Sequence, residues 1–173
     1  MKGISVSIFA ILILALLVTA YSRTTQIGTI KKETITAQTI SSQPAGKPYV
    51  LDLTRKGTVY EIAAGVDFSR ARVRTSMGEQ AMSDLARKLG LTGKFLLGTW
   101  QNLSGLDFGF PPGTIDPPDA GPSAAKCDSY VCTCNGRKDC SDLSKSGKCG
   151  PVAVCGEGKG GKPGKWGCTC TPR

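Results

Sequence analysis

The sequence of 173 residues contains no histidine. Without histidine the chain can form neither a Ser-His-Asp triad nor a Cys-His pair, and it lacks the side chain that most often acts as a general acid or base. The sequence also has no phosphate-binding loop and no glycine motif for a dinucleotide. We therefore predict that the protein is not an enzyme and that it uses no cofactor.

Aromatic residues are scarce, at 6% of the chain, although the formal net charge is +9. Proteins that bind single-stranded nucleic acid usually combine a basic groove with aromatic side chains on which the bases stack. Here the lysines and arginines are spread along the chain without such interleaved aromatics. We therefore expect no nucleic-acid partner despite the positive charge.

Cysteine is absent from the first part of the chain, and eight cysteines then follow close together: Cys127, Cys132, Cys134, Cys140, Cys149, Cys155, Cys168 and Cys170. They include no C-x-x-C pair, with which zinc ribbons, iron–sulfur sites and thioredoxin-like redox centres generally begin. A dense, even-numbered set is typical of a disulfide framework in an exported protein. We predict that all eight form disulfides and that none binds a metal. The alternative is a Cys-only metal-binding or thiol redox protein.

Two C-x-C units, Cys132-Thr133-Cys134 and Cys168-Thr169-Cys170, share the same three residues. Residues i and i+2 of a strand point to the same face with parallel side chains, so a disulfide within either unit is unfavourable. We predict that each of these cysteines bonds elsewhere, and that the units are short neighbouring strands of a small antiparallel sheet. Eight cysteines allow 105 pairings, and the spacing does not choose among them.

The first 20 residues have the layout of an export signal. Lys2 precedes an apolar run over residues 4–18, and Val18-Thr19-Ala20 places small residues where a signal peptidase cleaves. The same run is a hydrophobic helix near the minimum length for a membrane anchor. We predict a signal peptide or an anchor, so that the rest of the chain is secreted, periplasmic or membrane-anchored in an oxidising compartment. Membrane contact is expected only through this segment, if it is uncleaved.

Composition divides the remaining chain into four regions. We predict a threonine-rich stalk or edge strand over residues 21–46, a small α+β region over 47–107, a Pro/Gly linker over 108–125 and a disulfide-stapled module over 126–173. The predicted fold class is therefore a small α+β stem followed by a disulfide-rich, loop-dominated module with short antiparallel strands. The last region has few large apolar residues, so its disulfides are expected to be its main support.

Local patterns in the middle region predict particular elements. Residues 49–53 and 58–63 read as two strands of a hairpin. A capping box at Ser76 and Glu79, with Gly90 at the other end, predicts a helix over residues 77–89. A further strand is expected over residues 95–97, continuing to Trp100. The alternation in residues 70–74 places three arginines on one solvated strand face.

The C-terminal region also contains candidate polar sites. Asn135-Gly136 and Ser146-Gly147 predict turns, and we interpret Asp139 and Asp142 as turn residues, with a calcium site that adds Asp128 as the alternative. Asn102-Leu103-Ser104 is a glycosylation sequon.

Three lysines recur at every third position before a tryptophan near the C-terminus. In an extended loop this spacing places the ammonium groups along one side. The set predicts either a solvated loop that lysine keeps soluble or a contact surface for an unknown macromolecule or an anionic envelope surface. It comprises Lys159, Lys162, Lys165 and Trp166.

Overall fold

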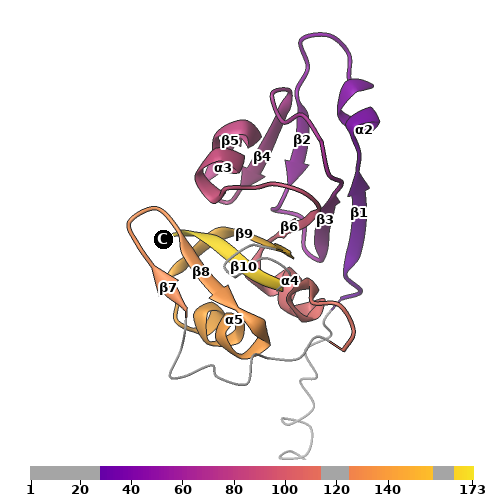
Figure 1. Cartoon of the computed structure of the whole chain (residues 1–173). Helices are drawn as coiled ribbons and strands as arrows, with labels where there is room; N and C mark the ends of the chain where they lie inside the picture. The colour runs from indigo at the N-terminus through magenta and orange to yellow at the C-terminus, as the bar shows by residue number, and fades with distance from the viewer. Residues whose placement is uncertain (1–27, 114–124, 158–165) are drawn as a thin grey trace, which may run out of the picture.

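The computed structural model describes residues 28–113, 125–157 and 166–173 (Figure 1). The predicted export segment, most of the predicted linker and the three lysines Lys159, Lys162 and Lys165 lie outside these residues. Within the described ranges, no helix is long and apolar enough to cross a membrane. The chain is α+β with two mixed sheets, which agrees with the predicted class in its coarse form.

A seven-stranded sheet forms the centre of the structure, with the strand order β1-β3-β6-β9-β10-β8-β7. β1 and β3 pair in parallel, and each later pair is antiparallel. Its strands are β1 (Lys31–Ile35), β3 (Thr58–Ile62), β6 (Phe95–Gly98), β7 (Lys126–Cys127), β8 (Cys132–Asn135), β9 (Cys149–Glu157) and β10 (Trp166–Pro172). β1 is an edge strand, which was one of the two alternatives for the threonine-rich segment.

The central sheet joins the two sides of the predicted linker. β6 comes before that linker and β9 after it, yet the two strands pair from Phe95 opposite Gly156 to Gly98 opposite Ala153. The predicted region boundaries stay predictions, but the regions on either side of residues 108–125 contribute to one sheet.

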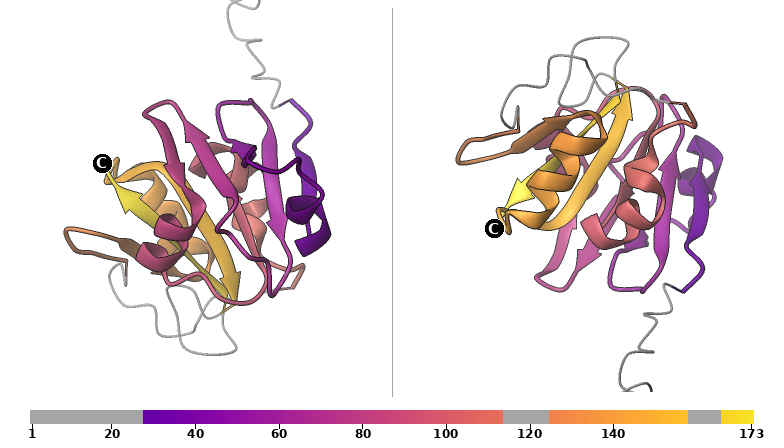
Figure 2. Two further views of the ribbon diagram at one scale, coloured as in Figure 1. Left: turned by 90° about the horizontal axis from the view of Figure 1, so that it is seen from above. Right: turned by 90° about the horizontal axis from the view of Figure 1, so that it is seen from below.

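A smaller sheet has the order β2-β4-β5 and packs over one face of the central sheet (Figures 1 and 2). It consists of β2 (Tyr49–Asp52), β4 (Ala71–Thr75) and β5 (Gly78–Ala81). The predicted hairpin of residues 49–53 and 58–63 is therefore wrong, although both strands exist. β2 and β3 lie in different sheets because both bury apolar side chains in the layer between them. The backbone N–H of Asp52 donates to the Tyr60 hydroxyl across that layer, at 2.9 Å.

The two faces of the central sheet bury different cores. Side chains alternate between the two faces along β3, β6 and β9. Those of Tyr60, Leu97 and Val154 therefore pack toward the smaller sheet and α3 (Met82–Leu89). The opposite face carries Leu96, Ala153 and most of the cysteines under three helices. These are α4 (Trp100–Gly105), the short 3-10 helix η1 (Asp107–Gly109) and α5 (Gly136–Lys145). The remaining helix, α2 (Ala37–Ser41), follows β1.

The predicted helix over residues 77–89 begins later than expected. Residues 78–81 form β5, which pairs with β4 in a hairpin from Thr75 opposite Gly78 to Arg72 opposite Ala81. Gly78 has φ 117°, a conformation that glycine adopts readily, so the chain turns where the capping box predicted helix. Gly90 does end α3 in the left-handed conformation, as predicted. Trp100 opens α4 rather than extending β6.

The C-terminal region is less dominated by loops than predicted. Asp139 and Asp142 lie on α5, a ten-residue helix, so their interpretation as turn residues is wrong. Gly136 has φ 73° and supplies the predicted turn, which leads directly into this helix. A disulfide from Cys140 and the burial of Leu143 hold α5 against the sheet. The segment has too few apolar positions for its sequence to indicate such packing.

Candidate functional site

All eight cysteines form disulfides, as predicted. The pairs are Cys127–Cys132, Cys134–Cys140, Cys149–Cys170 and Cys155–Cys168. All four bridges lie in the C-terminal region: one joins β7 to β8, one joins β8 to α5, and two join β9 to β10. These disulfides fit a protein that folds in an oxidising compartment.

The two C-x-C units are neighbouring antiparallel strands, which confirms the sequence prediction. Cys168 lies opposite Cys134, and Cys170 lies opposite Cys132, on strands β10 and β8. Each cysteine bonds to a residue outside its own unit. The pattern identified the two units as neighbouring strands, and in the structure both place their cysteine side chains on one buried face.

Sulfur atoms from different disulfides lie close together beneath α5 and beside it. The sulfurs of Cys132, Cys149 and Cys170 are within 4.8 Å of one another, and so are those of Cys134, Cys140 and Cys168. Each trio contains one complete disulfide and one sulfur of another. A metal site of cysteines requires thiolates, commonly four for zinc, whereas these sulfurs are oxidised and gather in threes. The arrangement fits structural disulfides better than the metal-binding alternative.

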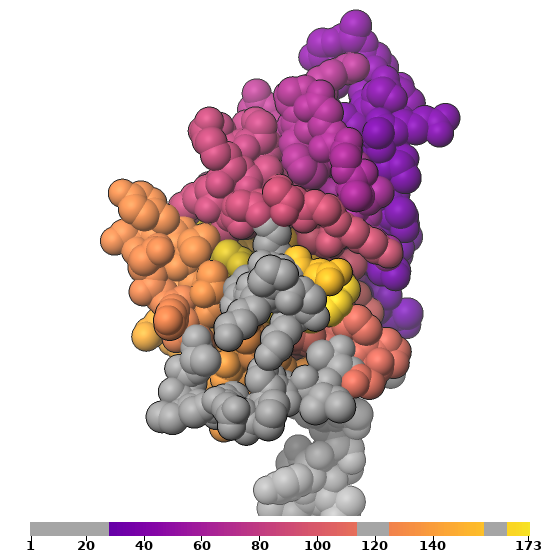
Figure 3. Space-filling model, in the orientation of Figure 1, coloured from indigo at the N-terminus to yellow at the C-terminus, as the bar shows by residue number. Residues whose placement is uncertain are grey.

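A disulfide-closed hairpin projects from the body of the protein at the end of the central sheet (Figures 1 and 3). β7 and β8 pair through Cys127 and Cys132, which are also joined by a disulfide. At the tip, Asp128 accepts hydrogen bonds from the backbone N–H groups of Tyr130 and Val131, each at 2.7 Å. These two bonds hold the pKa of the Asp128 carboxyl below its ordinary value. The tip is therefore fixed in shape by a covalent bond and by a side-chain turn.

Tyr130 stands at this tip with 70% of its surface exposed. Among the described residues, only Met77 is another large hydrophobic residue with comparable exposure, at 76%. Our sequence interpretation missed Tyr130, although a signal was present. An aspartate directly after the first cysteine of C-x4-C indicates a tight turn, and the tyrosine falls at its outer end.

The predicted contact surface is only partly described. Trp166 begins β10, and it is half-buried against the core on the cysteine face. Its ring therefore has a packing role, while the assignment of the three lysines beside it stays a prediction. The sequon residue Asn102 is buried, with 6% exposure. Its side chain donates to the Thr58 carbonyl at 2.9 Å and accepts from the Gly57 N–H at 3.2 Å.

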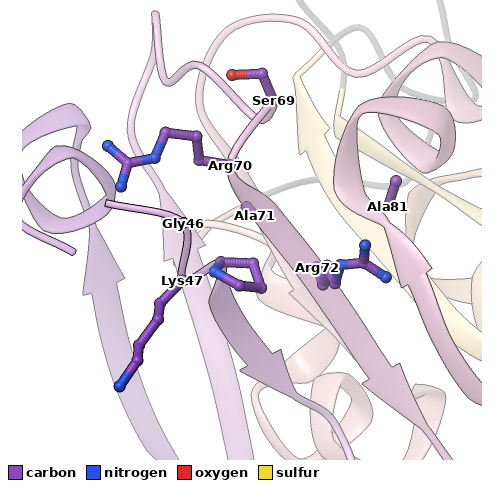
Figure 4. A pocket seen from close by; sticks show the side chains of 8 residues that line it. Gly46, Lys47, Ser69, Arg70, Ala71, Arg72 and Ala81 are labelled. Carbon is purple, nitrogen blue, oxygen red and sulfur yellow. The ribbon is translucent and has the colours of Figure 1, made fainter. Parts of the chain in front are cut away.

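A basic hollow lies on the outer face of the smaller sheet (Figure 4). It has a volume of about 270 Å³, and its charged lining residues are Lys47, Arg70 and Arg72. The predicted alternation of residues 70–74 is confirmed, because Arg72 and Arg74 are exposed and Ala71 and Val73 are buried. The sequence did not show that the start of this strand borders a hollow.

Comparisons with protein-family models, curated proteins and solved structures found no match for this chain.

Proposed function

We propose that this protein is an exported, non-enzymatic binding protein that contacts another macromolecule through the tip of its β7–β8 hairpin. The observation that carries this proposal is the exposure of Tyr130 on a hairpin closed by the Cys127–Cys132 disulfide. Export is supported by the four disulfides and by the predicted signal peptide or anchor in residues 1–20.

The shape of the tip favours recognition. A free loop loses conformational freedom when it binds, and each immobilised side chain costs about 0.5–1.5 kcal/mol. The disulfide and the two hydrogen bonds to Asp128 have already removed much of that freedom. Tyrosine is also enriched among the residues that contribute most to binding energy at protein interfaces. An exposed, fixed tyrosine is therefore suited to enter a pocket on a partner.

The chemistry of the tip favours a protein partner with an apolar pocket. Tyrosine combines a large apolar ring with a hydroxyl that both donates and accepts hydrogen bonds. Both turn hydrogen bonds use the Oδ1 atom of Asp128, and the Tyr130 ring is the large apolar feature that the tip presents. We expect the ring to enter the pocket and the hydroxyl to bond to a polar group at its base.

Site-specific photo-crosslinking tests this proposal. A benzoyl-phenylalanine at position 130 of the full chain, expressed in its native cells, should capture one discrete partner. The same group at position 77 is the matched control because Met77 is equally exposed on a different hairpin. Excess unlabelled protein should compete for the partner, whereas excess Tyr130→Ala protein should not. Identical products at positions 130 and 77, or equal competition by both proteins, would contradict the proposal.

Intact-mass measurement distinguishes the disulfide-bonded protein from the metal-binding or thiol redox alternative. Four disulfides lower the intact mass by about eight units and leave no thiol that alkylates before reduction. A metal-binding protein would instead take up alkylating agent once a chelator had removed its metal. We expect the exported protein to show the first result.

A further inference from the structure

The basic hollow lies on the smaller sheet, away from the β7–β8 hairpin, and the proposed function does not use it. It is bounded by the segment of residues 46–48 and by the start of β4. Three cationic side chains and no acidic ones are among its lining residues, which are Gly46, Lys47, Pro48, Ser69, Arg70, Ala71, Arg72 and Ala81.

These cations differ from several other basic groups of the N-terminal half, which pair with carboxylates. Arg74, two residues further along β4, pairs with Glu79 at 2.6 Å and with Asp52 at 3.6 Å. Glu61 likewise pairs with Lys32 at 2.6 Å and with Lys94. No acidic side chain in the described part of the chain pairs with Lys47, Arg70 or Arg72. The positive charge around the hollow is therefore uncompensated.

The backbone and the small residues explain how the hollow remains open. Ala81 lies directly opposite Arg72 on the neighbouring strand, and Ala71 is buried beneath. Arg70 donates to the carbonyl oxygens of Gln43 at 2.9 Å and Pro44 at 3.1 Å, which ties its guanidinium to the loop before β2. Figure 4 shows Lys47 and Arg70 on one side of Ala71 and Arg72 on the other. In this view the charged ends of Lys47, Arg70 and Arg72 point away from one another, and their stems border the hollow.

We propose that this hollow binds a phosphate group. A single carboxylate is matched by one arginine, whereas a phosphate presents several charged oxygens that can contact cations on different sides. Lys47 and Arg72 have no acidic partner among the described residues, and their flexible stems allow both to reach toward an anion between them. Arg70 adds its charge from a fixed position.

The ligand source is distinguished by two binding measurements on the full chain with its disulfides intact. Inorganic phosphate, titrated at constant ionic strength, should shift the amide resonances of Ala71 and Arg72. Vesicles of phosphatidylglycerol, compared with those of phosphatidylcholine, test whether a lipid headgroup supplies the phosphate. Binding to phosphate alone indicates a soluble phosphate ligand, and additional binding to the anionic vesicles indicates a membrane surface.

The matched variants remove equal charge from different places. Lys47→Gln with Arg72→Gln should weaken phosphate binding by at least about tenfold, because each side chain would lose a charge-assisted hydrogen bond to the phosphate. Lys145→Gln with Lys148→Gln, on and beside α5, should leave it unchanged. Equal effects from both pairs, or no phosphate-dependent shift at the hollow, would overturn the proposal. Tyr130→Ala should leave phosphate binding intact, so this site and the hairpin tip are tested separately.

Discussion

Asn102 belongs to a glycosylation sequon, which is a surface motif, but its side chain has a structural role in the interior. Its side chain bridges the Gly57 N–H and the Thr58 carbonyl, where the chain enters β3. The sequon therefore places its asparagine at a buried junction between α4 and the central sheet. In the folded protein this side chain is a structural group rather than an accessible attachment site.

Replacing Asn102 should reveal this role. Asn102→Ala removes this partner from the partly buried Gly57 N–H and from the buried Thr58 carbonyl, and we expect a loss of about 2–4 kcal/mol in the free energy of unfolding. Ser104→Ala also destroys the sequon but changes an exposed residue, so its effect should stay within about 0.5 kcal/mol. Denaturant unfolding of both variants provides the measurement. Equal stability of the two variants would show that Asn102 has no such role.

Glu61 gives the fold a specific dependence on pH. Hydrogen bonds from Lys32 and then from Lys94 hold the pKa of Glu61 below its ordinary value of 4.5. Because the folded-state pKa is lower than the unfolded one, the stabilisation is present above pH 4.5 and is lost as the pH falls through the folded value. We expect Glu61→Gln to reduce the decline in unfolding free energy below pH 4.5. An unchanged decline would contradict the importance of these pairs.

Among the secondary-structure elements, the β7–β8 hairpin holds the disulfide that is most accessible to a reductant. Cys127 is exposed, whereas both cysteines of each other bridge are buried. Thiol–disulfide exchange requires that the attacking group reach a sulfur atom. We expect limited reduction followed by alkylation to label Cys127 and Cys132 first, as measured by peptide mass mapping. Earlier labelling of any other pair would contradict the described burial.

Sequence patterns predicted elements better than they predicted pairing. The repeated C-x-C units identified β8 and β10 as neighbours because covalent geometry and strand alternation act together there. The strands at residues 49–53 and 58–63 were also found, but proximity in sequence suggested a hairpin between them. Their actual partners come from distant parts of the chain, and a local pattern carries no information about those contacts.

The missed features have a similar origin. A capping box at Ser76 and Glu79 favours a helix locally, but pairing of β5 with β4 outweighs that preference. α5 has few apolar residues, so only its disulfide and its contact with the sheet reveal why it is stable. The hairpin tip and the basic hollow depend on exposure and on missing acidic partners, which are properties of the folded chain.

At the scale of the whole molecule, the seam between β6 and β9 joins the three strands β1, β3 and β6 to the four strands β9, β10, β8 and β7. Gly156 lies at this seam, where an added Cβ would approach the Lys94 carbonyl and the Phe95 Cβ, each at 3.1 Å. These neighbours belong to the backbone or lie next to it, so they have little freedom to move. A side chain at position 156 would therefore force these neighbours to shift by a few tenths of an ångström.

A substitution at the seam should destabilise the whole protein. We expect Gly156→Ala to lower the free energy of unfolding by about 1–3 kcal/mol while unfolding remains a single transition. Gly28→Ala, where nothing lies within 4 Å, is the control. Far-UV circular dichroism and tryptophan fluorescence should give the same midpoint. Two separate midpoints would mean that the regions on either side of residues 108–125 unfold independently.

The position of β9 and β10 also determines the order in which the strands of the central sheet can pair. These strands come from the last part of the chain, yet they stand between β6 and β8 in the middle of the sheet. The edge of β6 has no partner until they arrive, and contacts between distant residues form slowly. The sheet therefore stays open at the edge of β6 until β9 and β10 are free to pair. The Cys149–Cys170 and Cys155–Cys168 bridges, which join these two strands, form no earlier.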